Sequence, residues 1–383
     1  MDFNSITINT KTASRNKAVE KVAGKVIRSY DKIMGKLKLG GRKANYDDHL
    51  YEFQGGAKDQ LRKKHYDKSL RLLWKAQGHL PWSSFKDSSQ DEKMLLGMAK
   101  KSLSKEEKIE RRRINSREFR DFLNKSYDPK QKQAIVNVLS LIGHGEAYAW
   151  MVSAELLNEV KSTGGRAALT MQVLEEAKHF VVLRELLQAF ECEIPPMPVW
   201  EYVLLERGFK SKGLEKFFAM NVVVEGFALG LFGMLSTLPG LEILKLFHLD
   251  ESRHTALPNN YFSEFPMTWW EKNAPLRRVH RMSLILPAVP VLFCIEESLA
   301  ELGIDTFDFG GSMARKILNL ADRVGFLMPI SNEAFSRLLN FLFNSYAKSS
   351  RQEHEWNDYM NSETTKGKEE LRVEKEIFQF LAG

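Results

Sequence analysis

Residues 174–180 read LEEAKHF and residues 249–255 read LDESRHT, so the chain twice places a carboxylate three residues before a histidine. Both copies lie in stretches whose apolar residues recur at helical spacing. Residues three apart on a helix share one face, with side chains about 5–6 Å apart. Glu176 and His179 can therefore hold one ion together, and Glu251 and His254 can hold another.

The first motif has an acidic partner upstream. Residues 134–160 predict a helix without proline, and STGG at 162–165 has the chemistry of a turn between two helices. In an antiparallel helical pair, residues equidistant from the turn lie at the same height. Glu146 and the midpoint of Glu176 and His179 centre near residue 162. This hairpin therefore places Glu146 at the same height as Glu176 and His179.

The second motif repeats this arrangement. Glu225 lies in the apolar stretch 217–241, and together with the midpoint of Glu251 and His254 it centres near residue 239, within TLPG. The two hairpins form a loose internal repeat. They predict an all-α fold in which a four-helix bundle brings four carboxylates and two imidazoles together.

Energetics favour a metal site for this cluster. Each unpaired buried carboxylate costs on the order of several kcal/mol, and two divalent cations would neutralise four of them. Oxygen-rich ligation with one imidazole per metal suits iron or manganese better than zinc. The predicted ligands of this dinuclear site are Glu146, Glu176, His179, Glu225, Glu251 and His254, and four of them, Glu146, Glu176, Glu225 and Glu251, are also the predicted catalytic carboxylates.

The charge is unevenly distributed along the 383 residues. The net charge is +7, but up to Lys132 there are 32 Lys and Arg against 17 Asp and Glu, and the remainder has 24 against 32. We divide the chain into a basic helical extension (1–132) packed on the core, a metal-binding bundle (133–305), and C-terminal helices with a charged tail (306–383). The basic part could meet an acidic partner, or it could simply be a solvated surface.

Composition limits the class of protein. A hydrophobic fraction of 43% and a charged fraction of 27% are those of a globular protein. Two cysteines cannot form a disulfide framework, and the start of the chain lacks the features of a secretory signal, so we expect a cytoplasmic location. The stretch 217–241 is long enough to span a bilayer, but its glycines, Asn221 and Glu225 favour packing inside protein.

The motifs resemble those of the ferritin-like dinuclear iron carboxylate proteins, over roughly residues 134–300. DESRH, residues 250–254, looks like the second metal motif of ribonucleotide reductase small subunits and of bacterial hydrocarbon monooxygenases. The resemblance implies that Asp250 orients a ligating histidine of the opposite motif, with Glu175 as its counterpart. LKLFHLDESRHTAL, residues 244–257, is similar to the arylamine N-oxygenases, which use an additional histidine; His248 is therefore a candidate seventh ligand.

The resemblance also limits the range of activities that we expect. The radical tyrosine of reductase small subunits would stand at Leu183, so we do not expect a tyrosyl radical. The expected function is a diiron oxygenase that uses two iron ions (or iron with manganese) and dioxygen to hydroxylate or N-oxygenate an organic substrate. Expected partners are a small-molecule or carrier-bound substrate, an electron-donating reductase or ferredoxin, and a second copy in a homodimer.

Three alternatives stay open. The chain could be a diiron desaturase or oxidase that acts on a carrier-protein-bound or nucleic-acid substrate docked by the basic region. It could be a membrane-associated oxidase, or a bundle that has become a binding module. Five residues within about a turn of the ligands are expected to be core or to line a substrate pocket: Trp150, Phe180, Leu183, Phe227 and Leu229.

Overall fold

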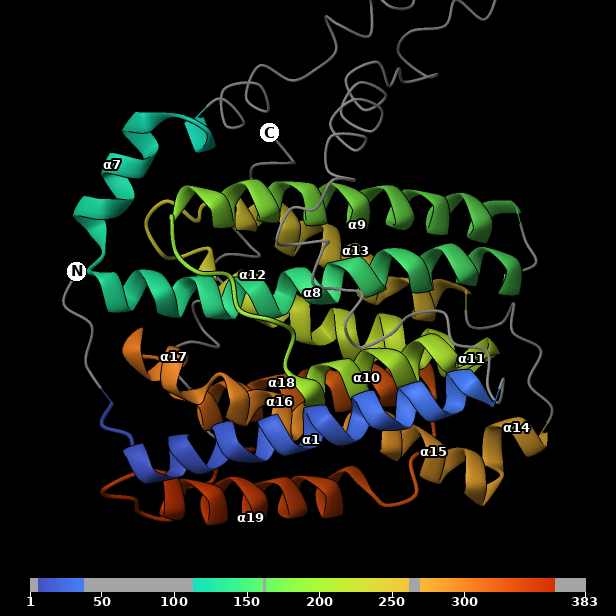
Figure 1. Ribbon diagram of the computed structural model, residues 1–383. Helices are drawn as coiled ribbons and strands as arrows, with labels where there is room; N and C mark the ends of the chain where they lie inside the picture. The colour runs from blue at the N-terminus through green and yellow to red at the C-terminus, as the bar shows by residue number, and fades with distance from the viewer. Residues whose placement is uncertain (1–5, 38–112, 161–162, 262–268, 362–383) are drawn as a thin grey trace, which may run out of the picture.

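A computed structural model describes residues 6–37, 113–160, 163–261 and 269–361, and these residues are almost entirely helical (Figure 1). Within them an isolated bridge between Ile8 and Arg351 is the only β-type pairing. The all-α prediction is confirmed. In chain order the helices are α1 (Thr10–Lys36), α7 (Arg117–Ser126), α8 (Pro129–Glu159), α9 (Thr163–Ala189), α10 (Val199–Lys210), α11 (Gly213–Phe217), the π-helical η1 (Phe218–Val224), α12 (Glu225–Leu235), α13 (Leu244–Tyr261), α14 (Trp269–Asn273), α15 (Pro275–Ile285), α16 (Ala288–Cys294), α17 (Glu296–Glu301), α18 (Thr306–Val324) and α19 (Asn332–Ser350).

The first predicted hairpin is present as α8 and α9, which lie side by side along their whole length (Figure 1). A capping box starts α8: the Asp128 side chain accepts hydrogen bonds from the backbone of Lys130 and Gln131, and the Gln131 side chain accepts one from the Asp128 amide. Because α8 ends at Glu159 and α9 begins at Thr163, the turn lies where the fold-back arithmetic placed it.

The second hairpin consists of η1 and α12 followed by α13. Its turn, between Leu235 and Leu244, is centred on the predicted TLPG. The Tyr127 hydroxyl donates a hydrogen bond of 2.7 Å to the Pro239 carbonyl oxygen. This bond fixes the start of α8 against the turn of the second hairpin, so α8 and α12 run in opposite directions.

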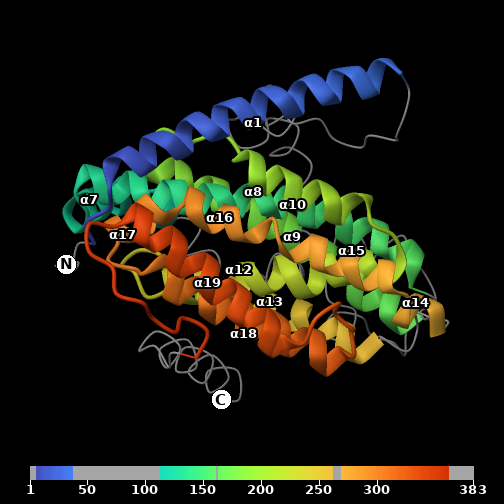
Figure 2. The same ribbon diagram turned by 90° about the horizontal axis from the view of Figure 1, so that it is seen from below.

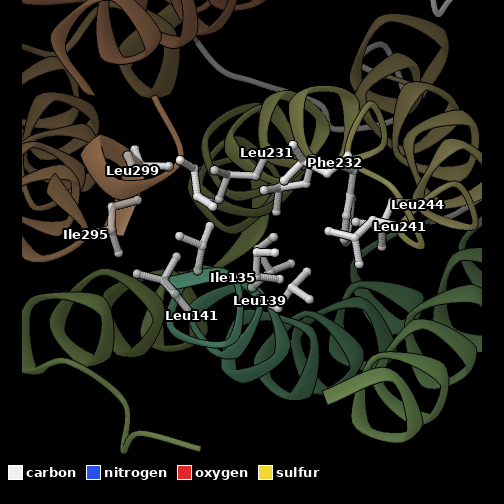
Figure 3. Close-up of a cluster of buried hydrophobic side chains, with 14 of the residues drawn as sticks. Ile135, Leu139, Leu141, Leu231, Phe232, Leu241, Leu244, Ile295 and Leu299 are labelled. Atoms are coloured by element: carbon white, nitrogen blue, oxygen red, sulfur yellow. The ribbon is translucent and has the colours of Figure 1, made fainter. Parts of the chain in front are cut away.

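Apolar side chains fill the space between the two hairpins (Figure 3). Ile135 and Leu139 of α8 face Leu231 and Phe232 of α12, and all four are fully buried. Burying such side chains stabilises the fold by about 1.5–3 kcal/mol each. The core on this side is closed by α17, which contributes Leu299.

Most of the remaining helices cover the side of the hairpins away from α9, whereas α7 (Figure 1) packs at the end of the hairpins against the turn at Gly240. Figures 1 and 2 show α10, α15, α16 and α18 next to the hairpins, with α1 and α19 outermost. The contact of α1 with the body includes polar groups: Asp31 accepts a hydrogen bond from the Tyr202 hydroxyl, and Glu20 accepts one from the Val199 amide. Part of the basic extension thus packs on α10.

The apolar stretch around Glu225 lies inside the protein. Among the described residues, the segment Gly213–Leu235 is long and apolar enough to cross a membrane, but 83% of its most apolar window is buried. A Cβ added at Gly230 would lie 1.9 Å from the Met313 sulfur atom of α18, so the missing side chain allows close helix packing. This burial is what the glycines of the stretch predicted.

The structure describes only part of the basic extension and part of the C-terminal region. Residues 38–112, which form most of the basic extension, and the tail residues 362–383 lie outside the described residues. Arg351 ends α19, and the described residues that follow it, up to Asn361, are not helical.

Candidate metal centre

Six side chains from four helices meet between the two hairpins. Among the residues that the structure describes, two groups of buried side chains could each hold a metal ion, and within each group the ligand atoms lie within 4.8 Å of one another. The first group is Glu146, Glu176, His179 and Glu251; the second is Glu176, Glu225, Glu251 and His254. Each group contains the histidine of one of the two helix motifs. Glu176 and Glu251 belong to both groups.

Both imidazole rings turn the same atom toward the centre. The Nδ1 atom of His179 lies 3.1 Å from Glu251 Oε1, 3.5 Å from Glu146 Oε2 and 3.8 Å from Glu176 Oε2. The Nδ1 atom of His254 lies 3.1 Å from Glu176 Oε1, 3.3 Å from Glu251 Oε2 and 3.6 Å from Glu225 Oε1. The sequence analysis predicted that these six residues meet, and in the structure their side chains lie together.

The outer atom of each ring is held by a carboxylate of the opposite motif. Nε2 of His179 lies 3.0 Å from Asp250 Oδ2, and Nε2 of His254 lies 2.9 Å from Glu175 Oε2. Carboxylates in this position fix the ring orientation and favour the tautomer that leaves Nδ1 free to bind a metal. The structure thus gives Asp250 and Glu175 the crossed contacts that the resemblance implied.

Basic residues hold the outer carboxylates in turn, and the sequence analysis missed them. Lys178 Nζ lies 2.7 Å from Asp250 Oδ2, and Arg253 donates to Glu175 Oε1 at 2.7 Å and also to Asp250. Each basic residue directly precedes a ligating histidine, so the internal repeat extends to them. With His179 and Lys178 as its partners, Asp250 has a pKa well below its usual range, although burial acts against this.

Atoms without hydrogen-bond partners support the metal assignment. Glu146 Oε2, Glu176 Oε2, His179 Nδ1 and Glu251 Oε1 are buried, and none makes a hydrogen bond of acceptable geometry. These four residues are the first ligand group. Buried polar atoms are nearly always satisfied, so their convergence fits a cation that would bind all four. Three oxygens and one nitrogen suit iron or manganese.

The protein without metal keeps protons in the cluster. Burial and the neighbouring carboxylates raise the pKa values of Glu146 and Glu225 well above normal. Burial alone would lower the pKa values of the two histidines, but the surrounding carboxylates raise both well above normal. Burial alone would raise the pKa of Glu176, but the neighbouring His254 and His179 side chains hold it well below normal. Protons thus occupy the places that metal ions would take.

The two ligand groups have different surroundings. The Gln172 amide donates to Glu225 Oε1 at 2.6 Å and to Glu176 Oε1 at 3.2 Å, and Asn221 of η1 donates to Gln172 at 3.0 Å. Seven residues before His254, where the repeat places the counterpart of Gln172, stands Phe247. Its ring stacks on His179 with centroids 4.2 Å apart. One half of the site is therefore polar and hydrogen-bonded, and the other is packed by an aromatic ring.

A small cavity adjoins the Glu146 and Glu225 side of the cluster. Its volume is about 40 Å³, and its walls come mainly from α8, α10 and the η1–α12 segment. Apolar side chains dominate the lining, and besides Glu146 and Glu225 the one other carboxyl group among the residues that form it is Glu201 of α10. No pattern in the sequence pointed to Glu201, which follows the proline-rich crossover 195–198.

Most of the five residues that were expected to be core or to line a pocket are core residues. Of the five, Phe227 alone lines the cavity; Phe180, Leu183 and Leu229 are buried, and Trp150 packs against Phe180 with ring centroids 6.3 Å apart. His248 is buried and belongs to neither ligand group; its Nδ1 lies 2.8 Å from the Leu229 carbonyl oxygen.

Comparison of the chain with protein-family models, with curated proteins and with solved structures found no match in any of the three. The assignment of this centre therefore depends on its geometry and chemistry: two overlapping sets of buried carboxylates and imidazoles that could hold metal ions.

Proposed function

We propose that the chain is a non-haem diiron oxygenase with a ferritin-like bundle, which uses dioxygen to hydroxylate or N-oxygenate an organic substrate. The observation that carries this proposal is the pair of overlapping ligand groups that share Glu176 and Glu251. Shared carboxylates let two cations lie next to each other, as a two-electron reaction with dioxygen requires. Two bound ferrous ions would supply those electrons, and a reductase or ferredoxin would replace them.

The protein's own residues have three tasks in this proposal. Glu176 and Glu251 would each contribute to both ligand sets, while Glu146 and His179 would complete one of them. Asp250 and Glu175 keep the imidazole rings oriented through their Nε2 atoms. The apolar cavity beside the cluster excludes bulk water from the face where dioxygen would arrive.

The volume of the cavity limits the size of the molecule that can bind in it. At about 40 Å³ it has room for a few water molecules or one dioxygen, because each water needs roughly 10–15 Å³ by this measure. An aromatic or acyl substrate would need the lining side chains to move. We therefore expect substrate binding to widen the cavity on the α10 side, where Leu204 and Leu205 form its wall.

Rapid mixing tests the proposed reaction. Protein loaded anaerobically with ferrous iron is mixed with oxygenated buffer, and the visible absorption is followed. We expect a transient charge-transfer band and consumption of dioxygen, because two adjacent ferrous ions can deliver two electrons together. Slow oxidation without a transient band, at the rate of ferrous iron in buffer alone, would contradict the proposal.

The basic N-terminal region has a feature that favours an acidic partner. All eight Lys and Arg side chains of α1 are exposed, whereas its acids Glu20 and Asp31 turn toward the body. Next to this basic face runs an exposed apolar stripe at helical spacing: Val19, Val22, Val26, Tyr30, Ile33 and Leu37. We propose that α1 docks an acidic carrier protein that presents the substrate.

Charge reversal tests the docking. Replacing Lys21, Lys25 and Lys32 by Glu should weaken binding of an acidic carrier protein roughly tenfold, since each exposed pair contributes up to about 1 kcal/mol. Binding of the unaltered chain should weaken as salt is added. Titration calorimetry measures both effects. An affinity for the carrier protein that changes neither with the substitutions nor with the salt concentration would exclude electrostatic docking.

A further inference from the structure

Glu201 is a buried carboxyl group that the metal assignment does not use. Its side chain is only 3% exposed, and its Oε2 atom has no hydrogen-bond partner. The residue belongs to the first turn of α10 and lines the same cavity as Glu146 and Glu225. A buried carboxyl group without a partner is costly, so its presence in an apolar wall calls for a ligand or a task.

A second acid connects Glu201 to the outside of the protein. Glu20 of α1 accepts a hydrogen bond from the Val199 amide and so caps α10, whose own cap residue, Pro198, supplies no side-chain bond. Glu20 also lines a larger, open pocket of about 520 Å³, together with Pro198 and Cys294. Glu20 thus lines the outer pocket and Glu201 lines the cavity at the metal cluster, and the two acids lie close enough for the charge of Glu20 to act on Glu201.

Both acids are suited to carry protons. Burial, assisted by the charge of Glu20, raises the pKa of Glu201 well above its usual range, and burial raises the pKa of Glu20. Glu20 from α1 and Cys294 at the end of α16 lie near Glu201, whereas Glu146 of α8 and Glu225 at the start of α12 line the same cavity.

We propose that Glu201 is a proton-relay group, which passes protons from Glu20 and the outer pocket to oxygen atoms in the cavity beside Glu146 and Glu225. This role rests on the proposed function, because insertion of one atom of dioxygen into a substrate releases the other as water. That release takes up protons and electrons in equal numbers, and the electron donor supplies only the electrons. The Glu201 O–H bond breaks as the new O–H bond forms, and Glu20 then returns a proton to the carboxylate.

The first test uses the chain without metal. Infrared difference spectra between the unaltered protein and Glu201→Gln should contain the carbonyl band of a protonated carboxylic acid at neutral pH. Glu206→Gln is the matched control, because Glu206 is a buried acid of the same helix whose carboxylate pairs with Lys210 at 2.8 Å. In Glu20→Gln the Glu201 band should disappear at a lower pH than in the unaltered protein, since the neighbouring negative charge is gone.

The second test uses the iron-loaded chain. Glu201→Gln should bind the same amount of iron but react with dioxygen about 100-fold more slowly, as is typical when a positioned acid is removed. Glu206→Gln should react at the normal rate. Normal iron uptake with an unchanged rate in Glu201→Gln, or no acid band in its difference spectrum, would overturn this role alone. A chain that takes up no iron would overturn the proposed function and this role with it.

Discussion

Replacing Glu176 by Ala should remove both metal ions, whereas replacing Glu146 by Ala should remove only one. Glu176 belongs to both ligand groups and presents one oxygen to each: Oε1 lies 3.1 Å from His254 Nδ1, and Oε2 lies 3.8 Å from His179 Nδ1. Glu146 belongs to the first group alone. Because loss of a partner that only orients a ligand already costs roughly 10–100-fold in affinity, loss of a shared ligand should cost more.

Metal analysis after anaerobic loading and gel filtration measures this difference. The expected iron content is well under one equivalent for Glu176→Ala and for Glu251→Ala, and about one equivalent for Glu146→Ala and Glu225→Ala. Asp250→Asn is a graded control, which should retain both ions with about 10–100-fold weaker affinity. Equal losses in all four ligand variants would show that no carboxylate is shared between two ions.

Metal binding should release protons and become weaker in acid. Glu146, Glu225, His179 and His254 all have raised pKa values in the metal-free protein, so each keeps its proton to a higher pH than usual, and a metal ion must displace that proton. Proton uptake by these groups stabilises the metal-free fold at low pH, and this stabilisation is lost as the pH rises through their raised pKa values. Metal ions then take over the stabilising role.

The affinity for metal should rise about tenfold per pH unit for each proton released. Titration calorimetry in buffers of different ionisation enthalpy counts these protons, and we expect up to about four when both ions bind. His254→Ala should release fewer protons than the unaltered chain. A binding constant that does not change between pH 6 and 8, about the window in which histidines titrate, would mean that metal binds outside this cluster.

The positions of the ligands could be predicted because helices have a constant rise. Two antiparallel helices joined by a short turn bring residues equidistant from that turn together, and this placed Glu146 opposite His179 and Glu225 opposite His254. The crossed contacts of Glu175 and Asp250 came from the family resemblance instead. Gln172 precedes Glu176 by one helical turn, so the same helical spacing could have placed it at the site.

Other residues could not be placed by helical spacing. Asn221 lies in the π-helical η1, whose wider turns break the 3.6-residue periodicity just before Glu225. Glu201 comes after a proline crossover, and no pattern in the sequence ties α10 to the cavity. Glu155 of α8 forms an ion pair with Lys216 of α11, and no pattern in the sequence indicates this contact. Such long-range partners depend on tertiary packing.

The position of His248 has a simple geometric reason. Steps of about 100° per residue place His248 and His254 about 60° to either side of Glu251, so they lie about 120° apart around α13. His254 faces the carboxylates, and His248 contacts the Leu229 carbonyl oxygen of α12. A role for His248 as a seventh ligand stays a prediction.

The central claim is that the six clustered side chains bind two metal ions side by side. The most direct measurement is an anaerobic titration of the metal-free chain with ferrous iron, followed by calorimetry and confirmed by metal analysis. The account predicts two equivalents bound per chain, in two steps of unequal affinity, because Gln172 borders one ligand group and Phe247 the other. Binding of no iron, or of a single ion that survives Glu176→Ala, would contradict it.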